Sequence, residues 1–220
     1  MFIDVYSDPV CPWCFIGHQR LATALGMAGL CDGKDGLAVR WQVFQLNPTM
    51  AAGGMDRKAY LSAKFGSPVR AQSVYGTIHS EGIREGIAFA FDRIKRTPNT
   101  LDAHRLMRLA SRSGRGSSVA EGLFSAYFLE GRDIGDHGVL SDIGQTCGIE
   151  LIDTAPEILS VADYLASSED ADDVRREDAA ARARGISGVP FYVFDERLSI
   201  SGAQSPEVLA RAIELANQYS

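Results

Sequence analysis

The sequence predicts an α/β protein in which one αβ domain is interrupted by an all-helical insertion. Patterns typical of β-strands occur near both ends of the 220-residue chain, and helical periods fill its middle. The predicted order is β-α-β, a helical block, then α-β-β-α. We therefore predict a discontinuous domain formed by residues 1–48 plus 166–220, and a helical insertion over residues 49–165.

The first predicted elements form a strand, a helix and a second strand. A β-branched and aromatic run at residues 2–6 predicts a strand, and residues 7–9 break it. Cys11 then occupies a helix N-cap, and Pro12 suits the first helical position because its missing N–H has no intrahelical partner there. Alternating apolar residues over 37–43 predict the second strand.

Helical periods separated by short breakers fill the insertion. Ser118 and Glu121 have capping-box spacing, which predicts that a further helix begins there. The other helices are predicted near residues 57–65, 68–79, 99–111, 139–147 and 156–166.

The C-terminal part returns to mixed structure. Acidic residues at 169–173 open a helix that ends before Gly185, since acids first and bases last complement the helix dipole. The strands predicted at 191–194 and 198–201 form a hairpin, and Ser205 followed by Pro206 begins a last helix.

Charge and hydropathy narrow the range of partners. The net charge of −6 argues against nucleic acid or an acidic membrane surface as a partner. The arginines at 105, 108, 112 and 115 are predicted to form a solvated helix face. No run reaches the roughly 18 apolar residues of a membrane span. The N-terminus has no features of a secretory signal, so we expect a cytoplasmic protein.

The motif Cys11-Pro12-Trp13-Cys14 carries the chemistry that the sequence predicts. Two cysteines on a strand-to-helix turn are typical of a redox pair. A helix N-terminus supplies a positive dipole end and free N–H groups, which favour a thiolate at Cys11. Cys11 is therefore predicted to be the attacking nucleophile and Cys14 the resolving thiol. In a reducing cytosol such a disulfide is usually transient and catalytic.

Zinc binding is an alternative use of the cysteines. Cys11 and Cys14 could bind zinc with His18 and Cys31, but a structural zinc site normally pairs two tight ligand couples. Cys31 and Cys147 are predicted to be small buried hydrophobes. His18 could stabilise charge near Cys14, or could simply pack or face solvent.

Val189-Pro190, at the entry to the third predicted strand, is the second clue. An X-Pro bond adopts the cis form at a cost of about 0.5–1 kcal/mol. A proline there has no N–H to donate and leaves neighbouring backbone groups free to bind an extended peptide. The alternative is an ordinary trans proline that begins a strand. No dinucleotide-binding, P-loop or HExxH motif is present.

Together these motifs resemble the DsbA-type thioredoxin-fold oxidoreductases. The resemblance rests on the cysteine motif, Asn47-Pro48, Gly188-Val189-Pro190-Phe191 and the run Ser201 to Gln204. The FrnE-like branch, named for polyketide biosynthesis dithiol–disulfide isomerases, is the most similar. The resemblance implies a thioredoxin-like (DsbA-like) fold with a helical insertion, and a cis-proline at Pro190 facing the cysteine pair. It also implies exchange with protein or small-molecule thiols and disulfides.

Two further hypotheses about the function remain open. The 2-hydroxychromene-2-carboxylate isomerases and kappa-class glutathione transferases share the fold, but typically have Ser where Cys11 stands. A glutathione-dependent isomerase or transferase is therefore the second hypothesis, and a non-catalytic peptide-binding module is the third. Some FrnE relatives carry a second, C-terminal cysteine pair; this chain has no cysteine after Cys147.

The resemblance also implies a set of site residues. Cys11, Cys14 and Pro190 are expected to be catalytic, and the insertion is expected to cap their side of the molecule. No cofactor is expected beyond the Cys11–Cys14 disulfide, although glutathione is a candidate co-substrate. The oligomeric state is left open between monomer and homodimer. The residues expected to contact substrate are Pro12, Trp13, Val189, Asn47, Asn99, His104 and Gln204.

Overall fold

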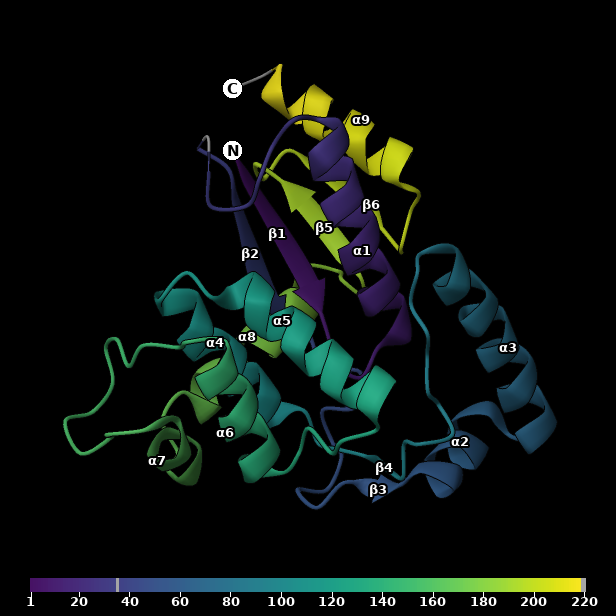
Figure 1. The fold of residues 1–220 in the computed structure, drawn as a ribbon, viewed down its shortest axis with the longest axis vertical. Coiled ribbons are helices and arrows are strands. Elements are labelled where there is room, and N and C mark those ends of the chain that lie inside the picture. Colours follow the sequence, from purple (N-terminus) through teal and green to yellow (C-terminus); the bar gives the residue numbers. More distant parts are fainter. Residues whose placement is uncertain (35, 219–220) are drawn as a thin grey trace.

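A four-stranded mixed sheet forms one half of the molecule in the computed structural model, which describes residues 1–34 and 36–218 (Figure 1). β1 (Phe2–Ser7) lies parallel to β2 (Ala38–Val43) and antiparallel to β5 (Phe191–Phe194). β6 (Leu198–Ser201) pairs antiparallel with β5, so the strand order is β2-β1-β5-β6. The predicted strands and the predicted hairpin are confirmed.

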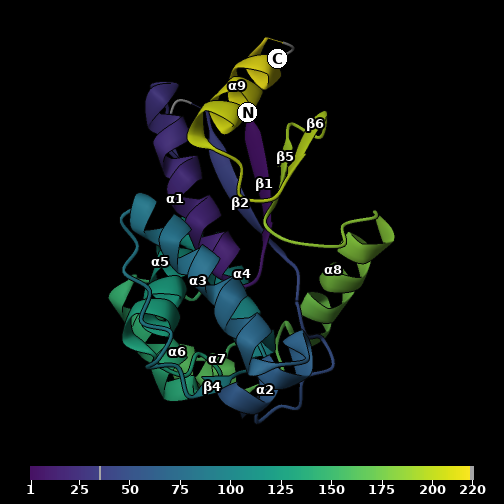
Figure 2. The same cartoon turned by 90° about the vertical axis from the view of Figure 1, so that its right-hand side faces the viewer.

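α1 (Pro12–Met27) and α9 (Pro206–Asn217) cover one face of this sheet. Successive side chains of a strand alternate between its faces, so Ile3 and Val5 of β1 join the hydrophobic cluster under these helices. Asp4 lies between them on β1 and accepts two hydrogen bonds of 2.7 Å from Arg40. Figure 2 shows α8 (Ala171–Ala183) on the opposite side of the sheet from α1.

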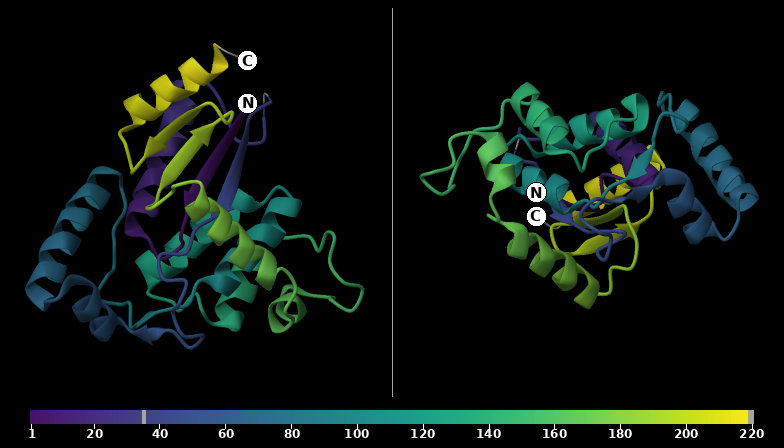
Figure 3. Two further views of the ribbon diagram at one scale, coloured as in Figure 1. Left: turned by 180° about the vertical axis from the view of Figure 1, so that it is seen from behind. Right: turned by 90° about the horizontal axis from the view of Figure 1, so that it is seen from below.

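The helical insertion lies beyond the end of the sheet where β1 finishes and α1 begins (Figure 3). Its first helix ends as predicted, whereas the second is longer than predicted and extends to Arg84. We predicted that the insertion ends at residue 165. Its last helix ends one residue later, at Ala166. The elements are β3 (Met55–Asp56), α2 (Arg57–Phe65), α3 (Pro68–Arg84), β4 (Arg96–Thr97), α4 (Leu101–Arg112), α5 (Gly116–Ser125), the π-helical turn η1 (Ala126–Glu130), α6 (His137–Thr146) and α7 (Val161–Ala166).

The capping box predicted at Ser118 is wrong. α5 begins two residues earlier, at Gly116, with Arg115 at the N-cap, so Ser118 and Glu121 both lie inside the helix. The reason is local: Gly114 adopts a left-handed conformation at φ +67°, which ends α4 and turns the chain at once into α5.

The predicted solvated face of arginines is also wrong, except at Arg115, which is exposed. Arg105 is only 2% exposed and donates hydrogen bonds to the backbone carbonyls of Tyr164 and Ser167. Arg108 and Arg112 both pair with Asp170, just before α8. The row of arginines therefore joins α4 to the α7–α8 connection, where carbonyls at the end of α7 need hydrogen-bond donors.

Two hydrophobic clusters share α1. The second half of that helix, including Leu21 and Leu25, packs under the sheet. The first half, including Cys14 and Phe15, packs into a larger cluster formed by the insertion. The predicted α/β fold with a helical insertion is thus confirmed. Within the described residues, no helix is long and apolar enough to cross a membrane.

Candidate active site

The cysteine motif lies on the turn between β1 and α1. Cys11 occupies the N-cap of α1 with extended backbone dihedrals, and Pro12 is the first helical residue, as predicted. The Cys11 N–H donates to the Asp8 carbonyl at 2.9 Å, and the Cys14 N–H donates to the Cys11 carbonyl at 3.0 Å. These bonds hold the two cysteines one helical turn apart, on the same side of the helix.

The cis-proline loop lies against Cys11. The Val189–Pro190 bond is cis, as the resemblance implied. Cys11 Sγ lies 3.6 Å from the Val189 carbonyl oxygen. The Gly202 N–H donates to the Pro190 carbonyl at 2.8 Å, which ties the β6–α9 loop to the same place. Cys11 and Val189 are 178 positions apart in the sequence, and the fold brings them into contact.

The two thiols are free and nearly buried, at 4% exposure for Cys11 and 2% for Cys14. Burial raises the pKa of Cys14 well above its ordinary value, and the neighbouring Cys11 raises it further. The Ser7 hydroxyl and the Asp8 backbone act in the opposite direction, because both favour the Cys14 thiolate. Cys14 is therefore a protonated thiol at neutral pH in the dithiol form.

A buried acid and a buried histidine lie directly behind the motif. Burial raises the pKa of Asp8 to about 6, although the Leu46 and Val10 N–H groups both hydrogen-bond its carboxylate. Burial lowers the pKa of His104 to about 4. His104 Nε2 lies 3.8 Å from Asp8 Oδ1, beyond hydrogen-bonding distance.

Buried polar atoms without partners gather around the cysteine motif. In the described part of the chain, the three such side-chain atoms belong to Ser7, His104 and Tyr192. Ser7 acts on Cys14, and His104 lies beside Asp8. The Tyr192 hydroxyl lies close to Gly17 and the Pro190 ring, because a Cβ on Gly17 would stand 2.3 Å from that hydroxyl. Unpaired buried polar groups are costly, so their concentration here marks a functional site.

Ser7, Asp8 and Tyr192 were not predicted as site residues. We interpreted residues 7–9 only as the end of a strand, and Tyr192 only as part of a buried strand. An aspartate three residues before the first cysteine of the motif was the one available signal. Its full burial depends on Leu46 and Thr100, which come from distant segments.

The residues expected to contact substrate fall into two groups. Pro12 is buried and Trp13 and Val189 are half-buried, all within the cysteine and cis-proline loops. Gln204 is exposed on the loop tied to Pro190, where it donates to the Ser201 carbonyl at 2.9 Å.

The second group serves other elements. Asn47 accepts a hydrogen bond from the Tyr60 hydroxyl of α2 at 3.3 Å. Asn99 donates to the Met50 carbonyl at 2.6 Å and accepts from the Leu101 N–H at the start of α4. His104 lies behind the motif, where it is 3% exposed.

The remaining cysteines and His18 lie elsewhere. Cys31 is exposed and Cys147 is half-buried, so the prediction that both are buried is wrong. Cys31 follows the end of α1 and Cys147 the end of α6, and both lie at the edge of the hydrophobic core rather than inside it. His18 packs beside the rings of Trp41 and Phe124, and burial lowers its pKa. No three His, Cys, Asp or Glu side chains of the described residues lie together in an arrangement that could hold a metal ion.

Similar proteins have been found in sequence and in structure. The uncharacterized protein YwbO of Bacillus subtilis (strain 168) is 25% identical over 213 residues, which are 96% of this chain and 94% of that protein. The crystal structure of a probable DsbA oxidoreductase, SCO1869 from Streptomyces coelicolor, is 29% identical with a TM-score of 0.83, and the similarity covers all of this chain and 91% of that one.

A third relative shares the fold at lower identity. It is the cytosolic disulfide reductase DsbM from Pseudomonas aeruginosa, solved with glutathione, at 18% identity and a TM-score of 0.63 over 99% of this chain and 100% of that chain. The family model of the DSBA-like thioredoxin domain matches residues 2–214, nearly the whole chain. The resemblance inferred from the motifs is confirmed, and the chain belongs to the DSBA-like thioredoxin domain family.

Proposed function

We propose that this protein exchanges disulfides through Cys11 and Cys14, with Cys11 as nucleophile and Cys14 as resolving thiol. Membership of the DSBA-like family supports an enzyme of the thiol–disulfide oxidoreductase or isomerase type. The observation that supports the assignment of roles is the difference between the two sulfurs. Cys11 lies at the helix N-terminus beside the cis-proline loop, whereas Cys14 is more deeply buried and its pKa is raised.

The proposed exchange takes place in two steps. The Cys11 thiolate attacks one sulfur of a substrate disulfide, a Cys11–substrate disulfide forms, and the other substrate sulfur leaves as a thiolate. Cys14 then loses its proton and attacks Cys11 Sγ, which releases the second substrate thiolate and leaves the Cys11–Cys14 disulfide. The same steps in reverse transfer the enzyme disulfide to a substrate dithiol.

The backbone next to Pro190 would orient a peptide substrate. The carbonyl of the half-buried Val189 lies beside Cys11 Sγ. A substrate backbone N–H that bonds this carbonyl would bring its own cysteine toward Cys11, in the manner of strand addition.

Matched cysteine variants test the proposal. Cys11→Ser is expected to lower both insulin reduction and oxidation of a reduced peptide by at least about 100-fold, since the nucleophile is gone. Cys14→Ser should accumulate a Cys11–substrate disulfide that mass spectrometry detects. Cys31→Ser is the control and should leave both rates unchanged, because that thiol is exposed and lies beyond the end of α1. Full activity in Cys11→Ser would contradict the assignment.

We propose glutathione as a co-substrate that reduces the Cys11–Cys14 disulfide in a cytoplasmic setting. DsbM, which shares the fold, was solved with glutathione. The insulin assay is therefore run once with glutathione and once with dithiothreitol as the reductant. Saturable glutathione binding, together with turnover of an aromatic substrate that survives Cys14→Ser, would instead favour the glutathione-dependent isomerase or transferase.

A further inference from the structure

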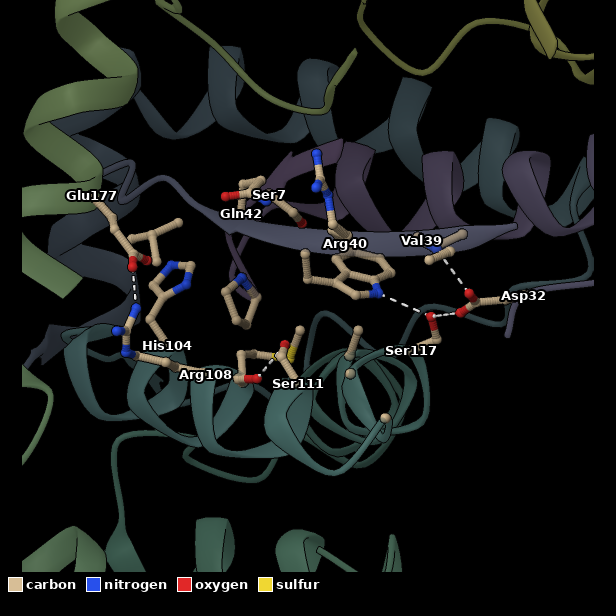
Figure 4. A pocket seen from close by; sticks show the side chains of 18 of the residues that line it. Ser7, Asp32, Val39, Arg40, Gln42, His104, Arg108, Ser111, Ser117 and Glu177 are labelled. Atoms are coloured by element: carbon tan, nitrogen blue, oxygen red, sulfur yellow. Dashed lines mark hydrogen bonds and ion pairs between the residues drawn. The ribbon is translucent and has the colours of Figure 1, made fainter. Parts of the chain in front are cut away.

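We propose that a cavity beside β2 binds a small uncharged molecule with a flat apolar body and a hydroxyl group. The cavity has a volume of about 480 Å³, within the range of ligand sites. All six residues of β2 line one side of it, and α4 and α5 line the other (Figure 4). Neither cysteine of the redox motif nor Pro190 lines it, but Ser7 and His104 do, so the cavity adjoins the proposed exchange site without including its sulfurs.

Small residues let an aromatic ring pack closely along the cavity. Gly116 and Ala120 of α5 and Ser111 of α4 line the cavity together with Trp41. A Cβ on Gly116 would lie 3.3 Å from Trp41 Cδ1, so the glycine allows the indole to approach the helix. The indole is held in place because its Nε1–H donates to Ser117 Oγ at 3.0 Å. A rigid ring beside small side chains suits a flat apolar ligand.

The charges around the cavity cancel, which favours a ligand without charge. Asp32 accepts hydrogen bonds from the Val39 N–H and from Ser117 at one end of the cavity. Arg108 pairs with Glu177 at the other end, and Arg40 is held by Asp4. Two cations and two anions therefore line the cavity, and each is already partnered. An anionic ligand would lose hydration without gaining a free cation, because both arginines are already paired with carboxylates.

The inner end offers hydrogen bonds that no protein group fills. Ser7 and His104 line the cavity and are 5% and 3% exposed. His104 Nε2 lacks a hydrogen-bond partner in the described part of the chain, whereas the Ser7 hydroxyl acts on Cys14. The Phe44 backbone is the hydrogen-bond partner of the His104 ring, which in its neutral form leaves Nε2 as an acceptor. A ligand hydroxyl that donates to Nε2 would supply the partner that His104 lacks.

Three probes of one shape test the chemistry. Isothermal titration calorimetry compares para-ethylphenol with its methyl ether, para-ethylanisole, and with para-ethylbenzoate. The phenol is expected to bind saturably. The ether, which cannot donate to His104, should bind about tenfold more weakly, as should the charged benzoate. Equal binding of phenol and ether would overturn the hydroxyl site, and equal binding of the benzoate would overturn the argument from charge.

Two matched variants test the location. Ser111→Phe places a ring in the cavity from an exposed position and should abolish phenol binding, whereas Ser118→Phe, exposed on α5 and outside the cavity, should not. In Trp13→Phe, Trp41 is the only tryptophan left, and its emission should change as the phenol binds. Circular dichroism verifies that each variant is folded. Phenol binding that persists in folded Ser111→Phe, or that is undetectable in the wild type, would overturn the proposal.

Discussion

Burial shifts the protonation of Asp8 and His104 in opposite directions. Between about pH 4 and 6, folded Asp8 keeps a proton that it would lose in the unfolded chain, since its pKa is raised from 3.8 to about 6. Over nearly the same range, folded His104 lacks a proton that the unfolded chain would bind, since its pKa is lowered from 6.5 to about 4. The folded and unfolded states therefore bind nearly equal numbers of protons at this pair, and stability changes little with pH on its account.

Single variants should reveal the two opposing effects. Asp8→Asn removes the group that binds more protons in the folded state, so stability relative to wild type should rise from pH 3.8 to 6. His104→Gln removes the group that binds more protons in the unfolded state, so stability relative to wild type should fall from pH 4 to 6.5. Each change should be on the order of 3 kcal/mol, measured by urea unfolding across that pH range. Slopes of the same sign would contradict this account of the pair.

Sequence reasoning identified the residues with a distinctive motif and missed those defined by burial. Cys11, Cys14 and the Val189-Pro190 bond each carry a local signal, and the structure brings Cys11 and Val189-Pro190 together. Ser7 carries no local signal and Asp8 only its place three residues before Cys11, because their burial depends on chain segments that are distant in sequence. Asn99 is the opposite case. The resemblance implied that it contacts substrate, and in the structure its side chain accepts a hydrogen bond from the Leu101 N–H at the start of α4.

At the level of elements, α1 connects the redox motif to the sheet through one close contact. Gly17 lies one turn after Cys14, directly against the Tyr192 hydroxyl and the Pro190 ring. Tyr192 is fully buried on β5, so it cannot swing aside. Gly26, near the end of the same helix, has no atom within 4 Å of the position that a Cβ would take. The two glycines therefore differ in packing rather than in secondary structure.

This difference predicts opposite effects of one substitution. Gly17→Ala is expected to destabilise the protein by about 1–3 kcal/mol, because the new methyl group overpacks a rigid core, and to lower exchange activity by displacing Pro190. Gly26→Ala should instead stabilise it by about 0.5–1 kcal/mol through helix propensity. Urea unfolding and the insulin assay measure both effects. A Gly17→Ala variant as stable and active as Gly26→Ala would refute the contact.

The predictable elements were those long enough to show a period. The strands at both ends and most helices of the insertion follow from alternation, helical spacing and N-cap residues. The two-residue ladder of β3 and β4 is too short to show any alternation. The π-helical turn η1 continues α5 without a break in apolar pattern, so only hydrogen-bond geometry distinguishes it. α3 continues beyond its predicted end to Arg84, and α7 begins only at Val161 because Ser160 caps it by accepting from the Asp163 N–H.

At the scale of the whole molecule, the helical insertion and the sheet share one helix. Phe15 follows Cys14 and stacks on Phe124 with ring centroids 5.2 Å apart, and Phe89 packs edge-on at 5.9 Å. Ten residues later, Leu25 packs under the sheet. The first turns of α1 therefore depend on the insertion for burial, and the position of Cys11 depends on both clusters.

This sharing predicts that the protein unfolds as a single unit. Phe15→Ala in the insertion cluster should cost about 3–5 kcal/mol, and Leu25→Ala in the sheet cluster about 2–5 kcal/mol. In each variant, far-ultraviolet circular dichroism, tryptophan emission and exchange activity should follow one urea transition that moves to lower concentration. The reason is that α1 packs into both clusters. When one cluster is lost, α1 is no longer held in place, and the other cluster is destabilised as well. The contrary result would be two transitions in Phe15→Ala, an early one for the insertion and a late, unshifted one for the sheet. The two parts would then unfold independently, and the insertion would not help to hold the active site in place.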